Sequence, residues 1–396
     1  ARTVVETDSE FYFLITNIKQ RRMKIRKLLF STLCMLALGT SFTACSDNDD
    51  PSDGFHDEDS KVTLPHHRAF ILNEGTMGAN NANISLYAPN KDCDFINDLY
   101  YQQNNARLGD TGQSMIEYND YLYVIVTNSK YIARLNTAGV EQNRYAFSET
   151  EGDPRYMTAD DGYIYITQYG GKVSKLDAES LNVVATFEGG SNLEGIVECN
   201  DKLYVANSYS KTDAGYQYHN EVFVINPQTM QLEKTLTVTV NPNQLIEEND
   251  KVFLISFGDY GAVGYTAQMI DPNNNDAVTV LATATSMTAG NGNVYFVNSE
   301  TDYSNWSETS TNNTFFSYNI ATSTLNQTSF LKDAPAELAT SSIYSMDVDD
   351  EDGNIYIGVT FYSNSNGTIY RFQQDGTFVE KFDCGGQNPK KMVFVD

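Results

Sequence analysis

Short runs in which aromatic or β-branched residues alternate with polar ones recur along the chain at intervals of 39 to 61 residues. An alternation with a period of two predicts half-buried β-strands. The copies are AFILNEG (69–75), YLYVIVTN (121–128), YIYITQYG (163–170), KLYVANSY (202–209), KVFLISFG (251–258), NVYFVNSE (293–300) and NIYIGVTF (354–361). An aromatic residue returns at the same position of every copy, so we expect these side chains in the core. They are Phe70, Tyr123, Tyr165, Tyr204, Phe253, Tyr295 and Tyr356.

Further strand-like runs accompany the copies. A second run follows each copy, as in TIYRFQ (368–373), and a third follows most of these, as in GTFVEKFD (376–383). A fourth run precedes the next copy, as in PRYMTAD (154–160). Four short alternating strands in each repeat unit are typical of a β-propeller blade.

The two ends of the repeat region complement each other. The first unit begins at its second strand (69–75), whereas KKMVFVD (390–396) resembles a first strand that lacks its blade. Pairing them completes a seventh blade and removes exposed sheet edges. We therefore expect residues 66–396 to form one all-β domain, a seven-bladed β-propeller. Each blade should hold four antiparallel strands, and the C-terminal strand should close the ring on the N-terminal blade.

Composition narrows the class of partner. Acidic residues outnumber Lys and Arg by 52 to 26, which gives a formal net charge of −26. Nucleic-acid binding needs clustered Lys and Arg for phosphate contacts, and adhesion to anionic lipid needs a basic surface. Both are therefore excluded as functions of the folded part.

The N-terminal segment predicts export. We expect residues 1–22 to lie upstream of the true start at Met23, and residues 23–44 to be a signal peptide with a basic start and an apolar stretch. The end of that stretch, FTAC (42–45), resembles a bacterial lipobox, which predicts lipidation of Cys45 and anchoring in the outer membrane, facing the cell exterior. The alternative is an ordinary signal peptide with an incidental cysteine.

An acidic segment follows Cys45. Residues 46–60 hold seven acids and neither Lys nor Arg, so we expect 45–65 to be a disordered tether. Three cysteines remain in the predicted domain, Cys93, Cys199 and Cys384, and their wide spacing matches neither a disulfide framework nor a zinc motif.

Catalytic and metal-binding patterns are sparse. The acidic run DVDDEDG (347–353) does not have the calcium-loop spacing, so we expect no metal there or elsewhere in the domain. The only histidines of the predicted domain are His66, His67 and His219, and no hydrolase or phosphate-loop motif is present. We therefore expect no catalytic residues and no enzymatic activity.

The connections between the second and third strands of the blades are polar yet rich in aromatic residues. Tyr and Trp bury area at low entropic cost, and Asn, Ser and Gly supply adaptable hydrogen bonds. This mixture predicts the binding of a large amphipathic ligand, although the rings could instead pack on one another to stiffen the loops. The candidates are Tyr169, Tyr209, Tyr216, Tyr218, His219, Tyr260, Tyr265, Tyr303, Trp306, Phe361 and Tyr362.

Connections between blades should line the central mouth on the same side of the ring. The ligand candidates there are Gln113, Arg155, Glu194, Gln244 and Tyr344, accompanied by Asn192, Asn243, Ser342 and Asn388. Arg155 could contact a ligand or could equally pair with an acid of an adjacent blade.

Several of these features together resemble a known family. The lipobox, the acidic tether, the opening FILNEGTMGANNANISLY (70–87) and the repeated D-x-LYV units are similar to the YncE-like propeller lipoproteins of gut Gram-negative bacteria, with the BtuG type most alike. The resemblance implies a surface lipoprotein that binds cobalamin (vitamin B12) and other corrinoids and delivers them to a BtuB-type TonB-dependent transporter. Cobalamin would then be a bound ligand and not a catalytic cofactor.

Two other classes remain open. A surface propeller that binds glycans or proteins would also use Tyr, Trp and Asn. A propeller hydrolase or lactonase would need carboxylate and Asn ligands for calcium at the channel, and few acids stand at the equivalent positions.

Overall fold

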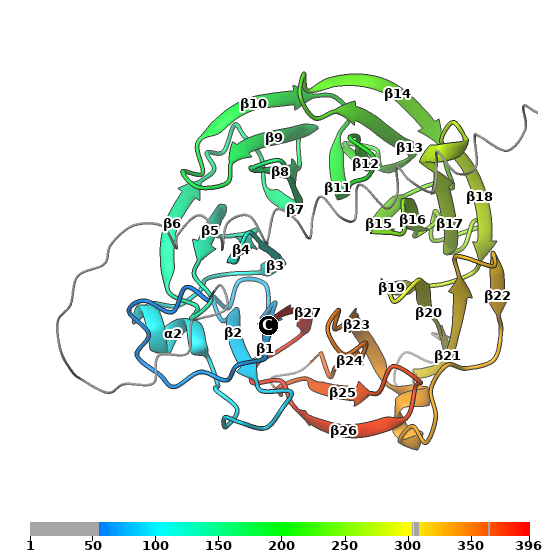
Figure 1. The fold of residues 1–396 in the computed structure, drawn as a ribbon. Coiled ribbons are helices and arrows are strands. Elements are labelled where there is room, and N and C mark those ends of the chain that lie inside the picture. Colours follow the sequence, from blue (N-terminus) through cyan, green and yellow to red (C-terminus); the bar gives the residue numbers. More distant parts are fainter. Residues whose placement is uncertain (1–54, 303, 305–308, 363–364) are drawn as a thin grey trace, which may run out of the picture. The chain divides into compact units, whose positions relative to one another are not determined.

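Seven antiparallel β-sheets arranged in a ring make up the folded part of the chain (Figure 1). The computed structural model describes residues 55–302, 304, 309–362 and 365–396. The sheets follow one another around the ring in chain order, and the first strand of each lies nearest the centre (Figure 1). The predicted seven-bladed β-propeller is thereby confirmed. The predicted signal peptide and Cys45 lie outside the described residues.

Six of the sheets contain four strands, each sheet formed by consecutive strands. From the innermost to the outermost strand they are β3 (Gly112–Tyr118), β4 (Tyr121–Val126), β5 (Tyr131–Leu135), β6 (Glu141–Ala146); β7 (Pro154–Asp160), β8 (Tyr163–Gln168), β9 (Lys172–Asp177), β10 (Val183–Glu188); β11 (Asn192–Glu198), β12 (Leu203–Thr212), β13 (Gly215–Asn226), β14 (Gln231–Thr237); β15 (Pro242–Glu248), β16 (Lys251–Ser256), β17 (Thr266–Asp271), β18 (Ala277–Ala282); β19 (Ser286–Gly290), β20 (Asn293–Asp302), β21 (Ser310–Asn319), β22 (Thr324–Asn326); and β23 (Ser342–Val348), β24 (Ile355–Thr360), β25 (Thr368–Phe372), β26 (Phe378–Asp383).

Tight hairpins join the first and second strands of several blades. Asn119 and Asp120 both adopt positive φ, 52° and 63°, between β3 and β4. Asn200 and Asp201 repeat this conformation between β11 and β12. Two-residue turns of this kind match the twist of the flanking strands, and Asn and Asp tolerate the left-handed conformation.

The core lies between adjacent blades and contains the aromatic residues that repeat along the sequence. All seven predicted positions are buried, from Phe70 and Tyr204 at 0% exposure to Tyr295 at 6%. Several of the tyrosine hydroxyls reach the following blade. Tyr123 donates to the carbonyl of Ala178 at 2.9 Å, and Tyr204 donates to Oδ1 of Asp276 at 2.6 Å. These side chains fill the space between blades and also join them by hydrogen bonds.

The C-terminal strand closes the ring. In the seventh sheet β27 (Pro389–Val395) pairs with β1 (Arg68–Asn73), which pairs with β2 (Asn83–Tyr87). Phe70 stands opposite Val393 on one side and Leu86 on the other. The outer strand of this blade is reduced to one bridge between Leu86 and Ile96, so the closing sheet has three regular strands.

A few short helices complete the structure. The helix α2 (Leu99–Asn104) follows the closing blade and packs against β2, and Leu99 and Tyr100 bury their side chains in the core there. The 3-10 helices η1 (Pro272–Asn274) and η2 (Ala336–Thr340) lie in connections. Among the described residues, no helix is long and apolar enough to cross a lipid bilayer.

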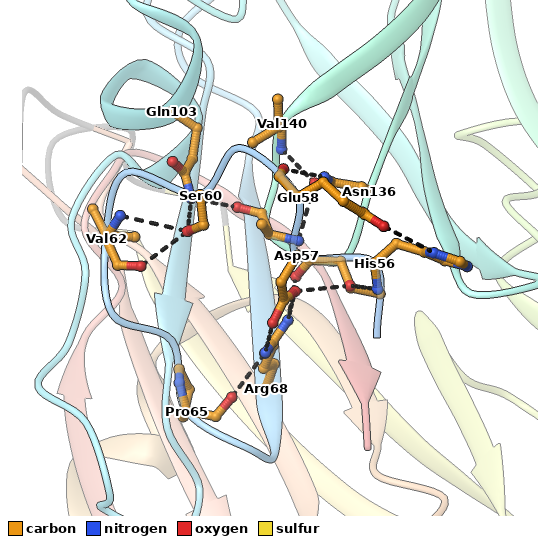
Figure 2. Close-up of polar contacts among 12 residues, drawn as sticks. His56, Asp57, Glu58, Ser60, Val62, Pro65, Arg68, Gln103, Asn136 and Val140 are labelled. Carbon is orange, nitrogen blue, oxygen red and sulfur yellow. Dashed lines mark hydrogen bonds and ion pairs between the residues drawn. The ribbon is translucent and has the colours of Figure 1, made fainter. Parts of the chain in front are cut away.

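Residues 55–65 pack against the propeller, which differs from the disorder expected for 45–65. The buried guanidinium of Arg68 forms two hydrogen bonds with the carboxylate of Asp57, both 2.6 Å long (Figure 2). Thr137 accepts a hydrogen bond from the backbone N–H of His56 at 2.7 Å, and Phe55 and Val62 pack against the core. The acidic composition did not reveal that one of these acids has a buried arginine partner. Residues 45–54 lie outside the described part.

Candidate functional site

One end of the central channel collects most of the predicted site residues. The innermost strands begin at this end, which they share with the connections between second and third strands, because consecutive strands are antiparallel. The pairing of Pro154 with Gln168 at the start of β7 shows this arrangement. Side chains at the second or third position of the innermost strands therefore meet around the channel mouth. They are Gln113, Arg155, Glu194, Gln244, Tyr344 and Lys390.

Arg155 joins three blades at this mouth. Its Nε lies 3.0 Å from Oε2 of Glu194 in the next blade, and its Nη1 donates to Oε1 of Gln113 in the preceding blade at 2.9 Å. Tyr169 donates to the other oxygen of Glu194 at 2.6 Å, and its ring centroid is 4.8 Å from the guanidinium. Of the two roles considered for Arg155, the pairing with an adjacent blade's acid is the one observed.

Burial strengthens this group. Glu194 is almost fully buried. Burial alone would lower the pKa of Arg155, but the Glu194 carboxylate raises it above its ordinary value, so Arg155 stays charged. Burial and the same carboxylate raise the pKa of Tyr169, which therefore remains a hydrogen-bond donor. The group is a closed ion pair with its hydrogen bonds largely satisfied.

A row of aromatic rings extends outward from Tyr169. Tyr169 packs edge to face on Tyr209 with centroids 6.0 Å apart, and Tyr209 packs on Tyr216 at 5.6 Å. Tyr216 and Tyr218 are stacked at 6.5 Å, and Tyr218 meets Tyr260 of the next blade at 5.7 Å. The row continues through Tyr265 to Phe257. Both sequence-based readings of the loops hold in part, because the rings pack on one another while Tyr216 and Tyr260 remain 59% and 65% exposed.

These rings and the Arg155 group enclose a cavity of about 500 Å³, which we call the rim cavity. It adjoins the central channel, with which it shares Tyr156, Gln244 and Lys390. Its lining combines rings, amides and a few charges: Arg155, Tyr156, Tyr169, Glu194, Ser208, Tyr209, Tyr216, Tyr218, Asn241, Asn243, Gln244, Phe257, Tyr260 and Lys390. A surface of this kind can contact a planar apolar group and hydrogen-bond amides or hydroxyls at its edge.

A second charged group stands across the mouth. Lys390 Nζ lies 3.1 Å from Oε2 of Glu74, and Tyr344 donates to the same oxygen at 2.7 Å. Tyr344 packs edge to face on Tyr362, with centroids 6.3 Å apart. Burial by itself would lower the pKa of Lys390, but Tyr156 and Glu74 raise it above its ordinary value. Two cations and two carboxylates thus neutralise each other in pairs at the mouth.

Several predicted site residues lie away from the rim cavity. Gln113 and Tyr344 line the central channel instead. Phe361 and Tyr362 are exposed on the blade of β24 and β25, at 54% and 72%. Tyr303 and Trp306 lie outside the described residues.

His219 forms a local pair and does not line the rim cavity. Its Nε2 lies 2.5 Å from Oγ of Ser210. Nucleophilic catalysis by such a pair also needs a third group that orients the histidine. Among the described residues no ion pair involves His219. The pair is therefore not assigned a catalytic role.

Sequence reasoning missed Lys390, Glu74, Tyr156 and Asn241. Lys390 could have been found by aligning the innermost strands, because it occupies the second position of β27 as Arg155 does in β7. Glu74 carried no comparable signal, since it follows β1 in a loop and reaches Lys390 only after ring closure.

The fold and its rim cavity define a seven-bladed β-propeller with a mixed aromatic and polar surface at one end of its channel. A family model described as "Domain of unknown function (DUF5074)" matches residues 68–250. No curated protein matches the chain in sequence.

Three solved structures share the fold at low identity. A quinonprotein alcohol dehydrogenase-like protein from Bacteroides thetaiotaomicron is 16% identical, covering 83% of this chain and 78% of its own, with a TM-score of 0.60. A functionally unknown protein from Desulfotomaculum acetoxidans is 12% identical, with coverages of 83% and 98% and a TM-score of 0.55. Hydrazine synthase from Kuenenia stuttgartiensis is 14% identical, with coverages of 67% and 77% and a TM-score of 0.53. At these identities the likeness shows the fold alone.

Proposed function

We propose that the protein captures a large, amphipathic and overall neutral ligand at the rim cavity without transforming it. The observation that carries this proposal is the cavity itself, in which aromatic rings and amides surround charges that are already paired. A surface with unpaired charges would favour ionic ligands. Here Arg155 pairs with Glu194 and Lys390 with Glu74, so hydrogen bonding and contact with the rings remain as the main sources of affinity.

Cobalamin is the candidate ligand, on the strength of the family resemblance. A corrin has a ring of amide side chains around a planar macrocycle, and its benzimidazole suits aromatic contact. A corrinoid is larger than the rim cavity. The cavity would therefore receive one edge of the molecule while the exposed rings of Tyr216 and Tyr260 cover the rest. The cobalt centre would be cargo.

The proposal includes a location and a partner. Lipidation of Cys45 would anchor the protein in the outer membrane, facing the cell exterior. The captured corrinoid would pass to a BtuB-type TonB-dependent transporter. The open rim of the propeller supports this view, because a ligand held at the surface can be handed on without unfolding its binder.

Titration of the purified protein with cyanocobalamin in a calorimeter tests the ligand directly. We expect one site per chain and co-elution of the red ligand in gel filtration. The double variant Tyr216→Ala/Tyr260→Ala should bind at least ten-fold more weakly, because exposed aromatic anchors commonly contribute more than about 1 kcal/mol each. Tyr101→Ala is the matched control, since Tyr101 is an exposed tyrosine on α2.

The outcomes separate the candidate functions. Absence of binding at micromolar cyanocobalamin would reject the corrinoid proposal. Binding of neutral oligosaccharides that is lost in the same double variant would assign the rim cavity to glycans. Equal cyanocobalamin affinities of the wild type and the double variant would place the site elsewhere.

A further inference from the structure

A cluster of one histidine and three carboxylates lies where the two ends of the propeller meet. His67 immediately precedes β1, and Asp396 immediately follows β27. Asp349 and Glu351 belong to the turn between β23 and β24 in the neighbouring blade. We call these four residues the closure cluster. It lies at the opposite end of β27 from Lys390 and is therefore separate from the rim cavity.

The side chains of the closure cluster converge on one imidazole. Nε2 of His67 is 2.9 Å from Oδ2 of Asp349 and 3.1 Å from Oδ1 of Asp396. Nδ1, the other ring nitrogen, is 3.3 Å from Oε2 of Glu351. Ligand atoms of a tetrahedral zinc ion with bonds of about 2.0–2.1 Å are separated by about 3.3 Å. The three atoms nearest Nε2 are thus spaced as the donors of one metal ion would be.

Two buried atoms of the cluster lack hydrogen bonds. His67 is 4% exposed and Asp349 is fully buried. Although they are close, Nε2 of His67 and Oδ2 of Asp349 are not aligned as donor and acceptor, and among the described residues neither atom has a hydrogen-bond partner. Buried polar atoms without partners are rare in native structures and call for an unobserved water or ion. Both atoms belong to the same cluster, which indicates a common ligand.

The charges of the cluster are also unbalanced. Three carboxylates surround His67, and the nearby bases serve other acids: Lys391 is 2.5 Å from Asp347 and Arg371 is 3.4 Å from Asp352. Burial alone would lower the pKa of His67, but Asp349, Asp396 and Glu351 raise it above its ordinary value. A single proton on the imidazole offsets one negative charge, whereas a divalent cation offsets two.

We propose that His67, Asp349 and Asp396 bind a divalent transition-metal ion of the Zn²⁺ class, with Glu351 orienting His67. An imidazole nitrogen together with carboxylate oxygens suits zinc and its neighbours better than calcium or magnesium, which prefer oxygen ligands alone. A carboxylate on the second nitrogen of a metal-bound histidine selects the tautomer and holds the ring in place. Asp396 is partly exposed, which gives the ion a path from solvent and leaves a coordination position for water.

The location gives the ion a structural effect. Its ligands come from the start of β1, the end of β27 and the turn of the adjacent blade, so binding would tie together the strands that close the ring. A ligand that binds only the folded state stabilises it by mass action. The metal should therefore raise the temperature at which the propeller opens.

Zinc binding to the tag-free protein, treated first with chelator, tests this proposal. We expect one Zn²⁺ per chain by calorimetry and elemental analysis, and a higher melting temperature when zinc is present. His67→Gln and Asp349→Asn should weaken zinc binding at least ten-fold, and Glu351→Gln should weaken it by about 10–100-fold. His66→Gln is the matched control, because His66 is the exposed neighbour outside the cluster.

Co²⁺ and a surface variant keep the test decisive if a buried substitution prevents folding. Co²⁺ bound by His67 should give visible absorption bands that disappear in Asp396→Asn, whose side chain is partly exposed. Less than one-tenth of a zinc ion per chain would overturn the proposal. So would unchanged zinc affinity in Asp396→Asn and Asp349→Asn, or tighter binding of Ca²⁺ or Mg²⁺ than of Zn²⁺.

Discussion

The hydroxyl of Tyr204 provides a sharp test of how neighbouring blades are held together. It donates to Oδ1 of Asp276 in the next blade at 2.6 Å, and both residues are buried. Tyr204→Phe removes this bond without changing the packing of the ring. Asp276 keeps Lys234 at 3.1 Å and Lys202 at 3.7 Å, so its charge remains paired but less well solvated.

The expected loss follows from the type of bond. A hydrogen bond to a charged group contributes about 1.5–3 kcal/mol. With an unfolding entropy of about 2.1 cal/mol/K per residue over roughly 340 folded residues, this loss corresponds to a decrease of about 2–4 °C in melting temperature. Tyr356→Phe is the matched control. Tyr356 occupies the equivalent position, but its buried hydroxyl has no hydrogen-bond partner among the described residues, so its removal should be nearly neutral.

The pH dependence adds a second check. Burial alone would raise the pKa of Asp276, but the hydrogen bonds from Tyr204 and Lys234 hold it below its ordinary value of 3.8. A carboxylate with a lowered pKa stabilises the fold above pH 3.8, and this stabilisation is lost as the pH falls through the folded-state pKa. The difference between wild type and Tyr204→Phe should therefore be complete at pH 7 and shrink below pH 3.8. Equal melting temperatures for Tyr204→Phe and Tyr356→Phe at pH 7, measured by calorimetry, would refute this reasoning.

Two further predictions concern charged pairs. Arg155→Met leaves Glu194 buried without its ion pair, so the melting temperature should fall by more than in Tyr204→Phe, and Arg155→Met/Glu194→Gln should recover most of the loss; a double variant no more stable than the single one would contradict this. Asp57→Asn should free residues 55–65 for protease cleavage at neutral pH, whereas Asp59→Asn, at an exposed position, should not. Because Arg68 lowers the pKa of Asp57 against the opposing effect of burial, the wild-type segment should stay protected above pH 3.8 and become cleavable as the pH falls below it. Equal cleavage rates at pH 7 for both variants would show that other contacts hold the segment.

The repeat pattern alone predicted the architecture. Strand alternation and the return of one aromatic position, from Phe70 to Tyr356, identified seven blades, the buried core and the pairing of residues 390–396 with 69–75. These features depend on local periodicity and on the need to bury one face of each strand, and both are visible in the sequence. The missing outer strand of the closing blade was not predictable in this way, because a single bridge at Ile96 leaves no alternating pattern.

Contacts between distant side chains depended on the tertiary structure. Sequence placed Arg155 and Glu194 at the channel mouth, but only the geometry of adjacent blades made them an ion pair. The closure cluster shows the same limit more clearly, since His67 and Asp396 lie at opposite ends of the propeller sequence. Their carboxylates and imidazole meet because the last strand pairs with the first, so no spacing along the chain could indicate a metal site. Periodicity reports which face of a strand is buried, whereas a site requires knowledge of which strands become neighbours.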